Sequence, residues 1–262
     1  MAKLNIDPTQ AQKPTLGFNP TEGDDWKGFE QISRDTMSIP FLRILQKLSP
    51  QLDKQKPEYI EGAEEGQFFN NITRTVYGNK LRIIVGSFEQ IYIEWRPNRG
   101  GFVGYHSVEH AEAIAADKTF GKWTTEDGNL LQENYVYMVL IEGHEDEGVC
   151  VLSLASSMIK EARAWNRLMT THVMPDGKKA LPYYLVWDVT TDYAKNDKGT
   201  WYKPKIIFAG YVNQNQYTKV KGERLALPSR TVDYKQLDGD HAEDGQQLDG
   251  AEATADAKKS GF

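Results

Sequence analysis

Short apolar runs rich in branched and aromatic residues occupy the middle of the chain, and polar turns separate them. Such runs are typical of β-strands, because branched and aromatic side chains pack well on a pleated surface. The pattern predicts strands over residues 68–76, 81–85, 90–95, 134–142, 148–154, 182–189 and 203–212. Strands 134–142 and 148–154 are expected to pair as a hairpin across residues 143–147.

Helical spacing appears in three places. Apolar residues between Phe41 and Leu48 recur every three or four positions before Ser49-Pro50, which predicts a helix there. The clearest helix runs to about Thr170, with Ser156 or Ser157 expected as its cap. A shorter helix is expected over residues 106–117, and residues 118–129 are expected to be rich in turns.

The pattern divides the chain into three parts. Residues 1–25 are expected to form a flexible arm, residues 26–230 a β-rich domain, and residues 231–262 a disordered acidic tail. One helix between two groups of strands suggests an α+β fold like the oligonucleotide-binding (OB) barrel, a five-stranded Greek-key barrel that often carries a helix between its third and fourth strands. Other β-sandwiches fit the same pattern.

The net charge of −6 is concentrated at the ends of the chain. Residues 231–262 contain eight acids and three lysines, whereas residues 31–230 contain 24 acids and 25 bases. A nearly neutral body excludes a general electrostatic attraction for nucleic acid but permits a local basic groove. No apolar run is long enough for a membrane helix, and we expect a cytoplasmic protein, in the host cytoplasm if a phage encodes it. Cys150 is expected to be a buried apolar residue.

Aromatic and basic residues alternate between Phe88 and Trp123. Single-stranded nucleic acid needs both kinds, because aromatic rings stack on bases and cations hold phosphates. The expected stacking residues are Tyr92, Trp95, Phe102, Tyr105 and Trp123, and the expected phosphate ligands are Arg82, Arg96, Arg99, Lys118 and Lys122. The alternative is that most of these rings belong to the core. On the predicted strand, Tyr92 and Glu94 should face one side, and Ile91, Ile93 and Trp95 the other.

The main predicted helix carries a basic stripe. Lys160, Arg163 and Arg167 are three and four residues apart, so they share one side of the helix and are candidate phosphate ligands. The alternative is an ordinary solvated helix face.

The sequence contains no motif that requires catalysis. His106 and His110 have a metal-ligand spacing, but no third ligand is apparent. Phosphate-loop, nucleophile-elbow and paired-cysteine motifs are absent. We therefore expect a non-enzymatic protein without a metal or cofactor.

The acidic residues of 231–262 are followed by Phe262. This layout resembles bacteriophage single-stranded DNA-binding proteins, in which a compact OB-type domain precedes an acidic tail with an aromatic residue at or near its end. The resemblance implies sequence-tolerant binding of single strands, and recruitment of replication or recombination proteins through the tail. The tail residues that it singles out are Asp249, Glu252, Asp256 and Phe262. Here Lys258 and Lys259 precede Phe262, whereas the commonest bacterial pattern has acids and a proline.

Two functions remain open from the sequence. The first is single-stranded DNA binding with tail-mediated recruitment of partner proteins, and the second is a structural or assembly role for a phage protein without contact to nucleic acid. The sequence leaves the oligomeric state open.

Overall fold

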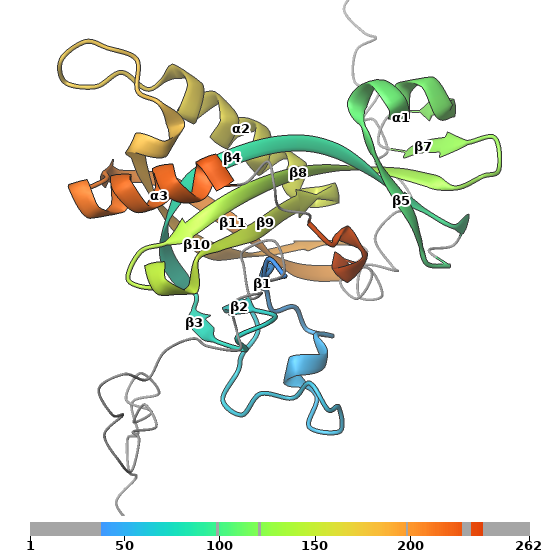
Figure 1. Cartoon of the computed structure of the whole chain (residues 1–262). Coiled ribbons are helices and arrows are strands. Elements are labelled where there is room, and N and C mark those ends of the chain that lie inside the picture. Colours follow the sequence, from blue (N-terminus) through green and yellow to red (C-terminus); the bar gives the residue numbers. More distant parts are fainter. Residues whose placement is uncertain (1–37, 98–99, 120–121, 198, 227–231, 238–262) are drawn as a thin grey trace, which may run out of the picture. The chain divides into compact units, whose positions relative to one another are not determined.

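The computed structural model describes residues 38–97, 100–119, 122–197, 199–226 and 232–237. As expected, this part of the chain is β-rich with helices added to it (Figure 1). None of the helices in these ranges is long and apolar enough to cross a membrane.

One antiparallel sheet contains most of the strands. Its path runs β11-β10-β4-β8-β7-β6, with β5 paired to β4 and β9 paired to β8. The strand bounds are β4 Lys80–Trp95, β5 Phe102–Ser107, β6 Ala115–Thr119, β7 Lys122–Thr125, β8 Leu130–Ile141, β9 Val149–Ala155, β10 Leu185–Asn196 and β11 Gly199–Tyr211. The expected hairpin around residues 143–147 is confirmed as the β8–β9 pair.

Strand β4 is the longest strand and replaces two predicted ones. It pairs along its length with β8, and its two halves pair on the other side with β10 and β5 (Figure 1). The register shifts between Val85 and Ser87, so Gly86 forms a bulge instead of a strand end. A sequence pattern that suggests a break therefore marks a bend in one continuous strand.

The helix predicted between Phe41 and Leu48 is wrong. Residues Leu42–Ile44 form strand β1, which joins β2 (Phe68–Asn70) and β3 (Val76–Gly78) in a small separate sheet. The reason is burial on two sides: Phe41 and Leu42 are consecutive but pack into different apolar clusters, as residues of an extended chain do.

Three α-helices complete the described elements: α1 (Val108–Ile114), α2 (Ile159–Thr171) and α3 (Gln214–Ala226). Helix α1 is shorter than predicted, because His106 belongs to β5 and Ser107 caps the helix. The predicted cap of α2 is also wrong, since a 3-10 turn over Ser156–Met158 precedes the helix and Met158 occupies the cap position. The turn-rich excursion 118–129 is largely the β6–β7 hairpin, and α3 was not predicted.

The main sheet is buried on both faces. Helix α2 covers one face, where Trp165 packs with Tyr137 and Trp187. The other face includes Ile91 and Trp95 and is covered in part by Val220 of α3. Residues 232–237 were predicted to be part of the disordered tail, but they pack on this second face through three buried side chains, Val232, Tyr234 and Leu237.

The described strands do not close into a barrel. The hydrogen-bonded path ends at β11 on one side and at β6 on the other, so the sheet is open. The coarse expectation of an α+β fold is met, whereas the expected barrel closure is not present among these strands.

Candidate nucleic-acid interface

The far end of β4 carries a stacked pair of aromatic rings. Tyr92 of β4 and Trp123 of β7 lie 4.8 Å apart between ring centroids, with 16° between their planes. The ammonium group of Lys118 on β6 lies over the Trp123 ring, 5.3 Å from its centroid. The hairpin register creates this contact, because Lys118 and Trp123 are direct cross-strand partners. The pair is partly open, since Tyr92 is buried but Trp123 is only half-buried.

The same face continues toward helix α2. Arg163 forms an ion pair with Glu133 of β8 at 3.0 Å and donates a hydrogen bond of 3.2 Å to the Tyr135 hydroxyl. Phe88 of β4 contacts the Tyr135 ring edge-on at 5.4 Å and is 43% exposed. Burial, followed by the charge of Glu133, raises the pKa of Tyr92 to about 12, so its hydroxyl stays neutral and able to donate. We call Phe88, Tyr92, Lys118, Trp123 and Arg163 the aromatic–basic face.

Helix α2 adds exposed cations beside this face. Its buried side consists of Ala162, Trp165 and Met169, which leaves Lys160 and Arg167 exposed on the opposite side. Within the described ranges, neither Lys160 nor Arg167 makes an ion pair. The predicted stripe is therefore divided: Arg163 is bound to Glu133, and the other two cations face solvent.

Two predicted stacking residues pack on the core instead: Trp95 is buried in it, and Phe102 is half-buried against it. Trp95 is only 1% exposed, and its indole donates a hydrogen bond of 3.0 Å to Gln132. Phe102 packs against the Trp95 ring at 5.9 Å. The predicted alternation along β4 is confirmed, since Ile91, Ile93 and Trp95 share one cluster and Tyr92 belongs to another. This alternation places Trp95 on the opposite side of the sheet from the aromatic–basic face, so its ring is not available to a base.

Tyr105 lies on that second face as well. It is 49% exposed, and its ring packs on Tyr234 at 4.6 Å. A ring of the C-terminal segment 232–237 therefore already occupies one side of Tyr105.

The predicted phosphate ligands outside α2 have different surroundings. Arg82 forms ion pairs with Asp188 at 2.8 Å and Glu142 at 3.4 Å, so its charge is already neutralised. Arg96 and Lys122 are exposed, in the turn after β4 and at the start of β7. Arg99 lies outside the described residues, as do the tail residues Asp249, Glu252, Asp256 and Phe262.

The two histidines with metal-ligand spacing do not lie on one helix. His106 in β5 bonds through Nε2 to Glu94 at 2.8 Å, and its ring lies 4.9 Å from that of His110 in α1. The second oxygen of Glu94 accepts a hydrogen bond of 2.7 Å from Asn129. In the part of the chain that the structure describes, no group of three histidine, cysteine or acidic side chains could hold a metal ion.

A third aromatic group was not predicted from the sequence. His172, Phe208 and Tyr211 come together where α2 ends beside β11. Nothing in their spacing indicates this contact, because 35 residues of intervening chain separate His172 from Phe208. The rings meet because strand β11 lies beside the end of helix α2 in the folded chain.

One comparison with known proteins gives a result. A family model described as Pam3 phage gp34-like protein matches residues 10–233, which contain nearly all of the described chain. Searches of curated proteins and of solved structures give no match.

Proposed function

The chain belongs to the Pam3 phage gp34-like protein family, and we propose that it binds single-stranded DNA without strong sequence preference. The proposal includes recruitment of replication or recombination proteins through the acidic C-terminal segment. A phage protein of this kind would act where single strands are exposed in the host cell.

The observation that carries the proposal is the Tyr92–Trp123 stack with Lys118 over the Trp123 ring. A base has a flat π-face and can extend such a stack whatever its identity, which gives sequence tolerance. A lysine beside the same ring can move from the ring to a phosphate of the bound strand. The half-buried Trp123 has room for a base because the hairpin that carries it lies at the edge of the sheet.

The cations of α2 support the same proposal. Lys160 and Arg167 have no acidic partner among the described residues, and Arg163 is anchored at the border of the aromatic–basic face. Bases stacked near Tyr92 and Trp123 would leave phosphates within reach of this helix, because Arg163 pairs with Glu133, the direct cross-strand partner of Tyr92. Phosphate contacts of this kind are independent of sequence.

The order of strands supports an OB-like topology. Strands β4, β8 and β9 follow one another as antiparallel neighbours, α2 comes next, and the β10–β11 hairpin returns to pair with β4. A helix between the third and fourth strands of a partly open five-stranded sheet is the layout expected for this fold. The β5–β7 region is then an insertion between the first two strands, and it supplies Lys118 and Trp123.

The test is a titration of the full-length protein with oligo-dT at low and high salt. We expect quenching of tryptophan emission, a rise in oligonucleotide anisotropy, and weaker binding as salt increases. Trp123→Phe is the matched control: it should keep most of the affinity and lose most of the quenching. If oligo-dT changes neither emission nor anisotropy at low salt, the proposal is wrong and an assembly role becomes the better explanation.

A further inference from the structure

Three rings form an exposed cluster on the other flank of α2. His172, which ends the helix, lies 4.3 Å from the Phe208 ring, and its Nε2 lies 3.1 Å from the Tyr211 hydroxyl. Phe208 and Tyr211 contact each other edge-on at 5.3 Å. Both are open to solvent, with 40% and 43% of their surfaces exposed. The Trp187 ring, buried in the core, contacts the Phe208 ring edge-on, with 5.9 Å between ring centroids.

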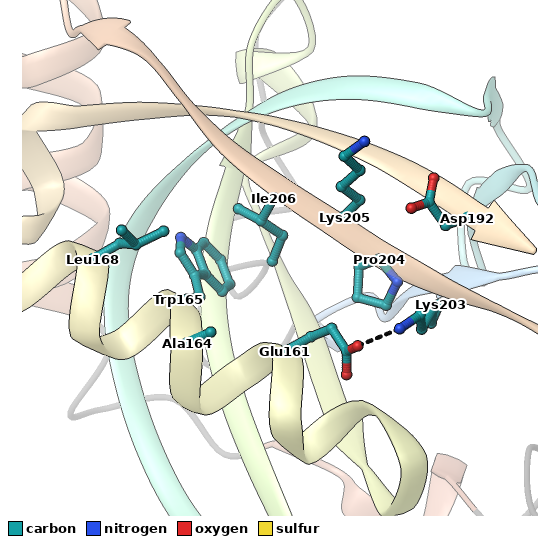
Figure 2. Close-up of a pocket in the computed structure, with 9 residues that line it drawn as sticks. All are labelled: Glu161, Ala164, Trp165, Leu168, Asp192, Lys203, Pro204, Lys205 and Ile206. Carbon is teal, nitrogen blue, oxygen red and sulfur yellow. Dashed lines mark hydrogen bonds and ion pairs between the residues drawn. The ribbon is translucent and has the colours of Figure 1, made fainter. Parts of the chain in front are cut away.

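A groove between α2 and β11 borders this cluster. Figure 2 shows the groove, which has a volume of about 240 Å³, with Trp165 and Leu168 on the helix opposite Ile206 on the strand. The Glu161–Lys203 ion pair, at 2.6 Å, crosses it farther along α2 (Figure 2). Five of the twelve large apolar side chains that are well exposed in the described ranges belong to this region: Leu168, Val173, Leu181, Phe208 and Tyr211. Such a concentration indicates a binding surface rather than scattered exposure.

Two exposed cations lie close to His172 along the chain, whereas the groove itself is lined by both acids and lysines, Glu161, Asp192, Lys203 and Lys205. Arg167 lies five residues before His172, and Lys179 pairs with Val173, the residue after His172. Both side chains are exposed, and neither makes an ion pair within the described residues. The neighbouring Lys178 is neutralised by Asp176 at 3.3 Å. Exposed rings with unpaired cations at their border match single-stranded nucleic acid better than a neutral apolar partner.

We propose that His172, Phe208 and Tyr211 form a second platform for stacking bases of single-stranded nucleic acid. The strand would cross α2 between the two platforms, with its phosphates on Lys160 and Arg167. This inference rests on the proposed function. In it, the exposed cations of α2 bind the phosphates that lie between the two aromatic groups on opposite flanks of the helix. It also implies that a long strand contacts more of the protein than a short one.

The test compares oligo-dT of about 5 and about 16 nucleotides, near the two ends of the range that a single OB domain covers. The variant is Phe208→Leu with Tyr211→Leu, which keeps an apolar surface for packing but removes both ring faces. We expect the long oligonucleotide to bind about tenfold more weakly to the variant, with little change for the short one. Tyr193→Leu is the matched control, because Tyr193 is 58% exposed elsewhere on β10.

Other outcomes separate the two proposals. If the wild-type chain binds neither oligonucleotide, the proposed function fails. If the wild type binds both and the double variant binds both equally well, the second platform is wrong and the first stands. An equal loss for both lengths also overturns the second platform. A double variant that keeps its affinity for DNA, while Leu168→Asp in the groove abolishes self-association of the chain, would assign this surface to protein contacts instead. Photocrosslinking of bromodeoxyuridine oligonucleotides to Tyr211 gives an independent readout.

Discussion

Trp95 and Trp123 show how the position of one side chain decides its role. Both are tryptophans in the aromatic-rich region, yet Trp95 is enclosed in the core and Trp123 stacks on Tyr92 at the surface. Strand alternation separates them, because Trp95 has the parity of Ile91 and Ile93, not that of Tyr92. We therefore expect mutation of Trp123 to weaken DNA binding and mutation of Trp95 to lower stability.

Trp123→Ala should weaken oligo-dT binding about tenfold, because loss of one stacking ring typically costs about 1–3 kcal/mol. Anisotropy titration measures the effect, and circular dichroism confirms that the variant is folded. Tyr193→Ala removes another exposed ring and serves as the control. An unchanged affinity for Trp123→Ala would contradict the assignment of this ring.

Trp95→Phe should change stability and leave binding intact. The substitution removes the indole that donates to Gln132, and loss of a buried donor typically costs about 1–3 kcal/mol. Urea unfolding should show a lower midpoint, whereas the titration with oligo-dT should match that of the wild type. A stable variant with impaired DNA binding would mean that Trp95 contacts DNA after all.

Asp188 predicts how stability depends on pH. A hydrogen bond from Arg82, supported by Lys80, lowers the pKa of the Asp188 carboxyl below its ordinary value. The charged carboxylate therefore stabilises the fold above the unfolded pKa of about 3.9, and this contribution is lost as the pH falls through the lower folded value. The difference in unfolding free energy between wild type and Asp188→Asn should shrink as pH falls from about 6 to about 3. Asp127→Asn, at an exposed turn, should show no such trend.

At the scale of elements, the sequence predicts β8, β9 and parts of β4, β10 and β11, but it misses β1, β5, β6 and β7. The predicted strand 68–76 is two short strands, β2 and β3. The β8–β9 hairpin follows directly from two apolar runs with a polar turn between them. Gly86 resembles a strand end but forms a bulge, since β4 has partners on both sides that hold it together. Strand β10 extends to Asn196 through residues that look like a loop, because β11 pairs with it along that length. The partners of β4 lie far from it along the chain, and such long-range pairing leaves no local mark in the sequence.

Helix α2 is the element on which both proposed platforms depend. Its buried side faces the sheet, so Lys160 and Arg167 are exposed between the two aromatic groups. The spacing of the basic residues is visible in the sequence. The pairing of Arg163 with Glu133 is not, because Glu133 comes from β8.

Replacing both exposed cations of α2, as Lys160→Ala with Arg167→Ala, should weaken DNA binding and flatten its salt dependence. Each phosphate contact on a single strand contributes about 0.7 to the slope of log affinity against log salt, so the slope should decrease by about 1.4. Lys54→Ala with Lys56→Ala, in the exposed segment before β2, is the matched control. An unchanged slope in the α2 variant would mean that these cations do not contact phosphates.

At the scale of the whole molecule, the structure moves the start of the acidic segment. Val232, Tyr234 and Leu237 are buried, and Asn71 donates to the Gln236 side chain at 2.7 Å. These residues belong to the folded domain, although they follow a part of the sequence with little apolar content. Seven of the eight acids of residues 231–262 come after Leu237. In the proposed function, the segment that would compete with DNA for cationic surfaces is therefore 238–262.

Two truncations separate competition from folding. Deletion of residues 238–262 should tighten oligo-dT binding several-fold at low salt, because the acids compete with phosphates for the same cations, and should leave the thermal midpoint unchanged. Deletion of residues 232–262 should also lower stability, by about 1.5–3 kcal/mol for each large buried side chain that is removed. A full-length variant with the seven acids replaced by their amides is the control that separates charge from length. If the amide variant and the chain without residues 238–262 both bind oligo-dT like the wild type, the acidic segment does not compete with DNA. Only its proposed role in recruiting partner proteins then remains.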